Sequence, residues 1–171
     1  MQALGLIWGD VDSRAPDYWE NATRLDAPAH PGAVATLRAW RERQGADGFR
    51  VGRDIPSRAL SRVLRNLAVC EPIEEARDFR IRIAGTAFYR RFGRDITGER
   101  FSNLFACDTF AHNRSILIET MESGIPASIG YERAHGSRVI SRHECLVLPV
   151  FSPDGAARWA LTGLFFDDWA R

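Results

Sequence analysis

Alternating apolar and polar positions mark the strands of this chain, and most of them lie in its second half. Residues 79–83 alternate strictly, which predicts a strand with Phe79, Ile81 and Ile83 on its apolar face. Gly136-Ser137 is a good two-residue turn between two longer apolar stretches, which predicts a β-hairpin. The full pattern predicts five strands, at about residues 67–71, 79–84, 125–135, 138–150 and 157–166.

Helical spacing accounts for most of the remaining apolar residues. The helix with the clearest boundaries is expected at about 109–123, with Asp108 as its N-cap, Gly124 after its last turn and Pro126 preventing its continuation. A short helix is expected to end at Gly93. Three more helices are expected: one opened by Pro16 and carrying Tyr18, Trp19, Ala22 and Leu25, one at about 32–44, and one with Leu60, Val63, Leu64 and Leu67 at helical spacing.

The order of these elements defines the fold class. Successive strands joined by short turns form an antiparallel meander, and the first two strands must join the same sheet. The chain is therefore expected to be an α+β domain in which a five-stranded antiparallel sheet carries helices on one face. We expect residues 1–52 to form an N-terminal helical extension and residues 53–171 the main domain, within one globular unit.

Composition excludes several classes of protein. Hydrophobic residues make up 45% and charged residues 26%, and the formal net charge is +1. These are ordinary globular values, and the charge favours neither nucleic acid nor an anionic membrane as a partner. All 23 basic residues are arginine. Without lysine, the chain has neither the Schiff-base lysine of pyridoxal enzymes nor the lysine of a phosphate-loop nucleotide hydrolase.

The cysteines and the N-terminus indicate the compartment. The three cysteines are widely spaced and include no Cys-x-x-Cys pair, which is unlike a secreted domain held by disulfides. Residues 1–8 are apolar but have no basic flank and reach Asp10 almost at once, so they resemble neither a signal peptide nor a membrane span. We therefore expect a cytoplasmic protein.

Four short motifs follow one another along the chain, after a helix that carries Trp40. They are DIPS at residues 54–57, a strand with an AGT exit (FRIRIAGT) at 79–86, GRDITG at 93–98 and ECLVLP at 144–149. In this order they resemble the short bacterial PAS domains known as type five, with their GRDxTG and ExLxLP motifs and their leading tryptophan helix. The resemblance covers about residues 34–166, nearly the whole chain.

The resemblance implies a five-stranded antiparallel sheet that cups a small cavity against short helices. It also implies a sensory or docking function, because PAS domains bind haem, flavin, metabolites or only other proteins. Phe101 stands where photoactive flavin domains need a cysteine, and His112 lies opposite the apolar stripe of the long helix. Haem and photoactive flavin are therefore disfavoured as cofactors, and the ligand is unknown.

Four residues are candidates for lining a ligand cavity. Arg114 falls within the apolar stripe of the long helix, where it either snorkels to water or points into the cavity toward an acidic ligand or Glu144. On the hairpin, Arg142 and Glu144 share a face with the apolar residues that follow, and Tyr131 is expected opposite Arg142. This part of the hairpin is either a simple ion pair or the polar fringe of a pocket.

Catalytic and metal sites are not expected. His135 and His143 are predicted to lie about 25 Å apart along the strand, at about 3.3 Å per residue, so they cannot share an ion. His143 and Cys145 share a face, but no third ligand or orienting carboxylate accompanies them. An enzyme acting on a metabolite would need an acid and a base in the cavity, and only Glu144 with Arg142 is available beside His143.

The favoured function is a PAS-type sensory or regulatory module that binds a small molecule, docks a signalling partner, or both. We expect the output to pass to a protein partner or a homodimer through the N-terminal helices. The apolar candidates for this contact are Leu6, Ile7, Trp8, Tyr18 and Trp19. The arginine-rich stretch Arg38–Arg65 has a local excess of five positive charges, which suggests nucleic acid or an acidic protein as an alternative partner. Balanced charge elsewhere favours a solvated surface for this stretch.

Overall fold

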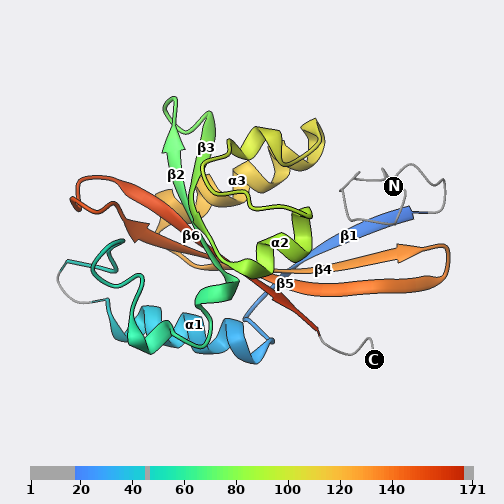
Figure 1. Cartoon of the computed structure of the whole chain (residues 1–171), viewed down its shortest axis with the longest axis horizontal. Helices are drawn as coiled ribbons and strands as arrows, with labels where there is room; N and C mark the ends of the chain where they lie inside the picture. Colours follow the sequence, from blue (N-terminus) through green and yellow to red (C-terminus); the bar gives the residue numbers. More distant parts are fainter. Residues whose placement is uncertain (1–17, 45–46, 168–171) are drawn as a thin grey trace.

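The computed structural model of the chain describes residues 18–44 and 47–167, which form a six-stranded antiparallel sheet with helices on both faces (Figure 1). The five predicted strands are present and β1 is an additional one, so the α+β class and the PAS-like antiparallel sheet are confirmed. The spatial order is β1-β4-β5-β6-β2-β3. The strands are β1 (Tyr18–Leu25), β2 (Leu67–Ile73), β3 (Asp78–Ala84), β4 (Ala127–His135), β5 (Arg138–Phe151) and β6 (Arg158–Phe166).

Within residues 18–44 and 47–167, three α-helices and three 3₁₀ turns connect the strands. They are α1 (Pro31–Glu42), η1 (Arg58–Leu60), η2 (Leu64–Asn66), α2 (Thr86–Phe92), η3 (Phe101–Asn103) and α3 (Cys107–Ser123). As predicted, α2 ends at Gly93 and α3 at Gly124, and both glycines adopt the left-handed conformation, with φ of 70° and 71°. The N-cap of α3 is Ala106, and Asp108 lies in the first turn, where its charge favours the helix N-terminus.

Residues 18–25 form β1, so the prediction of a helix in this segment is wrong. The strand pairs with β4 along its whole length, and this ladder outweighs the helix-like spacing of a few apolar residues. An ion pair of 2.8 Å between Arg24 and Glu119 also joins β1 to α3. Of the apolar residues expected to contact a partner, Tyr18 and Trp19 lie in β1, whereas Leu6, Ile7 and Trp8 lie outside the described part of the chain.

The helix predicted around Leu60–Leu67 is also wrong, because this segment forms the two short turns η1 and η2. Leu67 is the first residue of β2, and its carbonyl accepts a hydrogen bond of 2.9 Å from the backbone N–H of Gly85. A continuous helix would remove Leu67 from the sheet. The 3₁₀ turns still bury Leu60 and Val63, which are three residues apart.

The sheet has a hydrophobic core on each face, which corrects the expectation that helices cover one face only. On one face, α2, η3 and α3 cover Phe79 and Ile81. On the other face, α1 and the segment after it cover Leu146 and Leu148 (Figure 1). The predicted helix at 32–44 is thus confirmed as α1, and it packs directly on β5 and β6.

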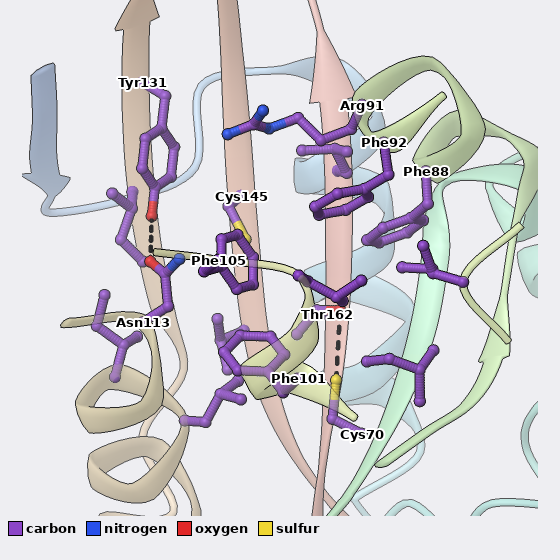
Figure 2. A pocket seen from close by; sticks show the side chains of 18 of the residues that line it. Cys70, Phe88, Arg91, Phe92, Phe101, Phe105, Asn113, Tyr131, Cys145 and Thr162 are labelled. Atoms are coloured by element: carbon purple, nitrogen blue, oxygen red, sulfur yellow. Dashed lines mark hydrogen bonds between the residues drawn. The ribbon is translucent and has the colours of Figure 1, made fainter. Parts of the chain in front are cut away.

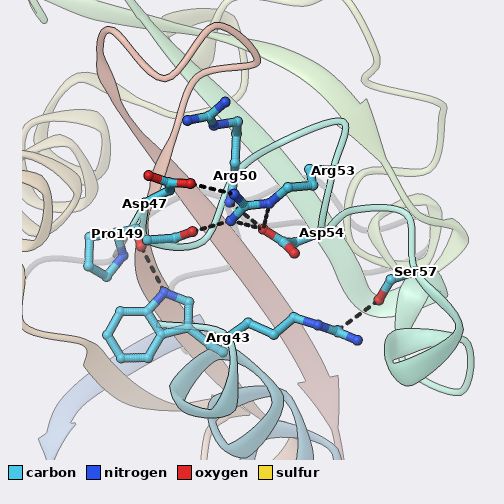
Figure 3. A network of polar contacts seen from close by, with 9 residues as sticks. Arg43, Asp47, Arg50, Arg53, Asp54, Ser57 and Pro149 are labelled. Atoms are coloured by element: carbon cyan, nitrogen blue, oxygen red, sulfur yellow. Dashed lines mark hydrogen bonds and ion pairs between the residues drawn. The ribbon is translucent and has the colours of Figure 1, made fainter. Parts of the chain in front are cut away.

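A network of polar contacts holds the loop that follows α1 (Figure 3). One carboxylate oxygen of Asp54 accepts hydrogen bonds from the backbone N–H of Arg50, at 2.8 Å, and from the guanidinium of Arg53, at 2.7 and 2.9 Å. Burial opposes ionisation of Asp54, yet these contacts keep its pKa below the usual value. Arg43 donates to the Ser57 hydroxyl at 3.0 Å, so part of the arginine-rich stretch is engaged within the molecule.

A β-bulge shifts the register of the β4–β5 hairpin. Arg133 lies opposite Ser141, whereas the next residue, Ala134, lies opposite Val139. Ile140 is therefore an extra residue in β5. The turn itself is the predicted one, but beyond the bulge every cross-strand pair is displaced by one residue from the prediction.

A second bulge corrects the predicted face of β3. Opposite β2, the strand β3 has one extra residue, Arg82. Phe79 and Ile81 precede it and are buried as predicted, whereas Ile83 follows it and is 47% exposed. The strict alternation of residue types therefore does not extend through the bulge, and Ala84 packs against the core instead.

Candidate functional site

A small cavity lies between the sheet and the helices α2, η3 and α3 (Figure 2). Its volume is about 80 Å³. At roughly 30 Å³ for each water molecule, this is space for a few waters or one small organic molecule. Most of the wall is apolar, and its aromatic part consists of Phe88, Phe92, Phe101 and Phe105.

The aromatic wall is built by short elements that pack edge to face. Phe88 and Phe92 are four residues apart, which puts both on the buried face of α2. The ring centroid of Phe105 lies 5.6 Å from that of Phe92 and 4.7 Å from that of Phe101, with tilted planes. Such contacts restrict the rings, so the shape of this wall is set before any ligand arrives.

Asp78 fastens η3 to the sheet and thereby holds one side of the cavity. Its carboxylate accepts hydrogen bonds from the Ser102 hydroxyl at 2.7 Å, from the Ser102 backbone at 3.1 Å and from Arg100 at 2.9 Å. Burial alone would raise the pKa of Asp78, but these hydrogen bonds keep it below the usual value. The carboxylate therefore stays charged in the fold.

The polar part of the cavity is centred on two stacked rings from β4 and β5. The Tyr131 and His143 rings are nearly parallel, with centroids 4.9 Å apart and an interplanar angle of 6°. The two residues lie directly opposite each other in the β4–β5 ladder. The Tyr131 hydroxyl donates to the side-chain oxygen of Asn113 on α3 at 3.1 Å, which links the sheet to the helix (Figure 2).

His143 is a buried histidine whose ring nitrogen Nδ1 has no hydrogen-bond partner among the described residues. The side chain is only 5% exposed, and Phe166 packs against it with centroids 5.3 Å apart. Burial lowers the pKa of His143 well below its usual value, and the nearby arginines lower it further. The imidazole is therefore neutral, with one ring nitrogen able to donate and one able to accept.

Arg91 is the only charged residue among the described residues that line the cavity. It is 4% exposed, and Figure 2 shows its side chain reaching from α2 across the sheet. Its charge, together with those of Arg133 and Arg90, contributes to the low pKa of His143.

Two of the three thiols, those of Cys70 and Cys145, also line the cavity. Burial raises the pKa of each to about 12. A thiol must lose its proton to act as a nucleophile, so neither is activated for catalysis. The sulfur of Cys70 lies 3.9 Å from the Thr162 hydroxyl, which gives it a weak polar contact in the sheet.

Of the four predicted site residues, Tyr131 lines this cavity. Arg114 does not point toward Glu144: its Nε donates to the carbonyl of Ala76, at 2.8 Å, in the turn between β2 and β3. The backbone of this turn is left-handed, with φ of 61° at Ala76. Arg114 therefore leaves the apolar stripe sideways and stabilises a strained turn.

Glu144 lies on the opposite face of the sheet, against the segment that leads into α1. One carboxylate oxygen accepts from the backbone N–H groups of Ala29, at 3.0 Å, and His30, at 2.7 Å, and the other accepts from the Ser128 hydroxyl at 2.7 Å. Because Glu144 is buried, these three donors compensate for its lost hydration. The predicted contact between Arg114 and Glu144 is therefore not formed.

The bulge in β5 explains why the predicted pairing across the hairpin is wrong. Tyr131 lies opposite His143 rather than Arg142, and Arg142 lies opposite Glu132, with which it forms an ion pair. Side chains alternate along a strand, so a shift of one residue turns Arg142 and Glu144 away from the face that carries Tyr131. Arg142 and Glu144 border a more open hollow beside the first residues of α1.

Sequence reasoning missed Arg91 and treated His143 as a stray residue. A signal for Arg91 exists, since it follows the buried Ala87 by four residues and Phe88 by three and so shares their helical face. No local signal for His143 exists, because its orientation depends on the bulge. His112 is exposed on α3, in agreement with the helical geometry.

Other kinds of site were sought in the same residues. Within residues 18–44 and 47–167, no three His, Cys, Asp or Glu side chains gather so that they could hold a metal ion. In this part of the chain, every helix is too short or too polar to span a bilayer.

An antiparallel sheet covered by short helices, with a cavity between them, is an α+β arrangement. The chain matches the family model of the PAS domain over residues 29–165, and it belongs to this family. The resemblance to the short type-five PAS domains is thereby confirmed. No curated protein and no solved structure matches the chain.

Proposed function

We propose that this PAS domain is a regulatory module that binds a small molecule in the cavity beneath α2 and α3 and passes its occupancy to a protein partner. The observation that carries the proposal is the buried Nδ1 of His143, which has no hydrogen-bond partner among the described residues and belongs to the lining of a cavity with aromatic walls. Buried polar atoms in proteins are usually hydrogen-bonded, so a ligand atom is a natural partner for this nitrogen.

The contacts of α3 provide a route by which occupancy could reach the surface. Asn113 binds Tyr131 in the cavity, and the next residue, Arg114, binds the turn between β2 and β3. Five residues further along, Glu119 is paired with Arg24 on β1. A ligand that displaces α3 would therefore alter both edges of the sheet, where a partner can bind.

The alternatives have less support. A catalytic role would need an acid and a base in the cavity, but both thiols are protonated and none of its described lining residues is a carboxylate. The hypothesis that the arginine-rich stretch binds nucleic acid is weakened because Arg38 and Arg53 are paired with acidic residues of the same stretch.

We place the protein in the cytoplasm because its three cysteines are free thiols, one of them exposed.

A pair of valine substitutions tests the ligand-binding proposal. Val147 lines the cavity, whereas Val34 is 45% exposed on α1, on the other face of the sheet. Val147→Phe should fill the cavity, and Val34→Phe adds the same group at the surface. Benzene is a suitable probe, because it enters dry apolar cavities in proteins.

We expect benzene to shift the NMR signals of cavity residues in the wild type and in Val34→Phe, and not in Val147→Phe. We also expect native mass spectrometry of the purified wild type to detect a co-purifying small molecule. If benzene shifts no cavity signals in the wild type and no small molecule is retained, ligand binding is refuted and a purely docking role is favoured.

A further inference from the structure

His143 brings a buried polar atom to the lining of a largely apolar cavity. Its ring lies on the cavity face of the sheet, because it stacks on Tyr131, whose hydroxyl reaches Asn113 on α3. The side chain is 5% exposed, and Nδ1 has no hydrogen-bond partner among the described residues. Leaving a buried polar atom without a partner is costly, so a ligand atom that binds Nδ1 gains affinity.

The protonation state of His143 selects the ligand group that can bind it. Burial lowers the pKa of His143 well below its usual value, so the imidazole is neutral at pH 7. A neutral imidazole has one nitrogen that donates a hydrogen bond and one that accepts. A hydroxyl group both donates and accepts, so it can pair with Nδ1 in either tautomer, whereas a carbonyl or ether oxygen suits only one.

Other polar side chains of the wall have partners within the protein. The Thr162 hydroxyl donates to a backbone carbonyl of β2 at 3.3 Å, and the side-chain oxygen of Asn113 accepts from the Tyr131 hydroxyl at 3.1 Å. Arg91 is also engaged within the molecule, and its guanidinium carbon lies 5.6 Å from the centre of the Phe92 ring. The ligand therefore needs neither a negative charge nor a second polar group.

The aromatic wall sets the shape of the rest of the ligand. The ring of Phe105 is inclined at 79° to that of Phe92 and at 55° to that of Phe101. Aromatic rings pack favourably at such angles, so an aromatic guest can extend this arrangement. The volume of about 80 Å³ limits the guest to a single ring, and no described lining residue is a carboxylate that would pair with a cationic one.

We infer that the ligand is a small phenol, whose single aromatic ring packs against the phenylalanine wall and whose hydroxyl group hydrogen-bonds to Nδ1 of His143. This inference rests on the proposed function and specifies its ligand class. A phenol hydroxyl, like that of tyrosine, has a pKa of about 10, so the ligand is uncharged at neutral pH.

Phenol and toluene test the inference, because they have nearly the same shape and differ by a hydroxyl in place of a methyl group. Both are titrated into the full chain at pH 7 and followed by NMR of the backbone amides and the imidazole nitrogens. A purely apolar cavity would favour toluene, since phenol gives up more hydration. We expect phenol to bind about fivefold more tightly than toluene, or tighter still, and to shift the Nδ1 signal of His143 much further than toluene does. These wild-type titrations do not depend on a variant that folds.

His143→Phe and His112→Phe provide the matched variants. His143→Phe keeps an aromatic ring against Tyr131 and removes the ring nitrogens, whereas His112 is exposed on α3 and is not among the described lining residues. We expect His143→Phe to weaken phenol binding about fivefold or more and to leave toluene binding nearly unchanged. His112→Phe should stay within about threefold of the wild type for both.

The two proposals fail in different ways. Phenol that binds the wild type no more tightly than toluene, or phenol binding that His143→Phe does not weaken, overturns the phenol inference. Benzene binding that persists in that case preserves the cavity as a ligand site. If benzene, phenol and toluene all leave the cavity signals unshifted, the proposed function fails, and the ligand class fails with it.

Discussion

Replacing Gly85 with alanine should be one of the most damaging small substitutions in this chain. Gly85 follows β3 directly and is the N-cap of α2, so it positions the helix that carries Phe88, Phe92 and Arg91. Its φ of −73° suits alanine, and backbone strain is therefore not the issue. The problem is space, because an added Cβ would lie 2.2 Å from the carbonyl oxygen of Arg65 and 2.6 Å from that of Leu64.

The expected cost follows from these distances. An ordinary contact of Cβ with another heavy atom is 3.4 Å or more, and both obstructing atoms belong to the backbone, which cannot rotate away as a side chain can. The segment before β2 must move by about 1 Å, which strains the packing by roughly 1–3 kcal/mol. The same movement stretches the hydrogen bond from Gly85 to Leu67, worth about 1 kcal/mol.

We therefore expect Gly85→Ala to lower the free energy of unfolding by about 3 kcal/mol. In a chain of this length, about 3 kcal/mol corresponds to a fall in Tm of roughly 6–12 °C. Circular dichroism during thermal and urea unfolding of the full chain measures both quantities. Because α2 is displaced, the aromatic wall should also loosen, and benzene binding should weaken.

Gly93→Ala is the matched control at the other end of α2. Gly93 has a φ of 70° and no atom within 4 Å of an added Cβ, so the substitution costs backbone strain alone. That strain is worth about 1–2 kcal/mol. If Gly85→Ala proves no more destabilising than Gly93→Ala, the close approach of the two backbones is not a constraint on the fold, and the reasoning is refuted.

Three further substitutions probe the polar groups. The pKa of His143 is lowered in the fold, so the unfolded chain takes up a proton more readily, and stability should fall as the pH drops below about 6.5. His143→Gln should therefore flatten the pH dependence of the urea midpoint. Parallel pH profiles for the variant and the wild type would contradict this expectation. Asp78→Ala removes a buried, hydrogen-bonded carboxylate and should lower the free energy of unfolding in urea by about 3 kcal/mol. The control, Glu99→Gln, lies in a largely exposed ion pair and should lower it by less than about 1 kcal/mol. Equal losses in the two variants would argue against the role of Asp78. Glu144→Ala should lower the free energy of unfolding by about 2 kcal/mol and speed amide hydrogen exchange in α1. Unchanged exchange in α1 would show that the carboxylate does not hold this helix.

The parts of the fold that could be predicted are those with a local physical cause. Gly93 and Gly124 end helices because they adopt a left-handed backbone, and Gly136 permits the tight turn of the hairpin. The strand β1 could not be predicted in this way, because its pairing partner lies more than 100 residues further along the chain. The turns at η1 and η2 likewise depend on the distant Gly85, whose backbone leaves no room for a side chain beside them.

The cavity itself shows how much depends on one residue that carries no signal of its own. An extra residue at Ile140 displaces the β4–β5 pairs by one, and the period of a strand is two, so the bulge decides which side chains face α3. With the bulge, Tyr131 stacks on His143, and Arg142 points to the other face. Without it, Tyr131 would share its face with Arg142, and the cavity would contain a second cation in place of a neutral ring. The polarity of the cavity is therefore set by the register of the hairpin as much as by the residue types in its two strands.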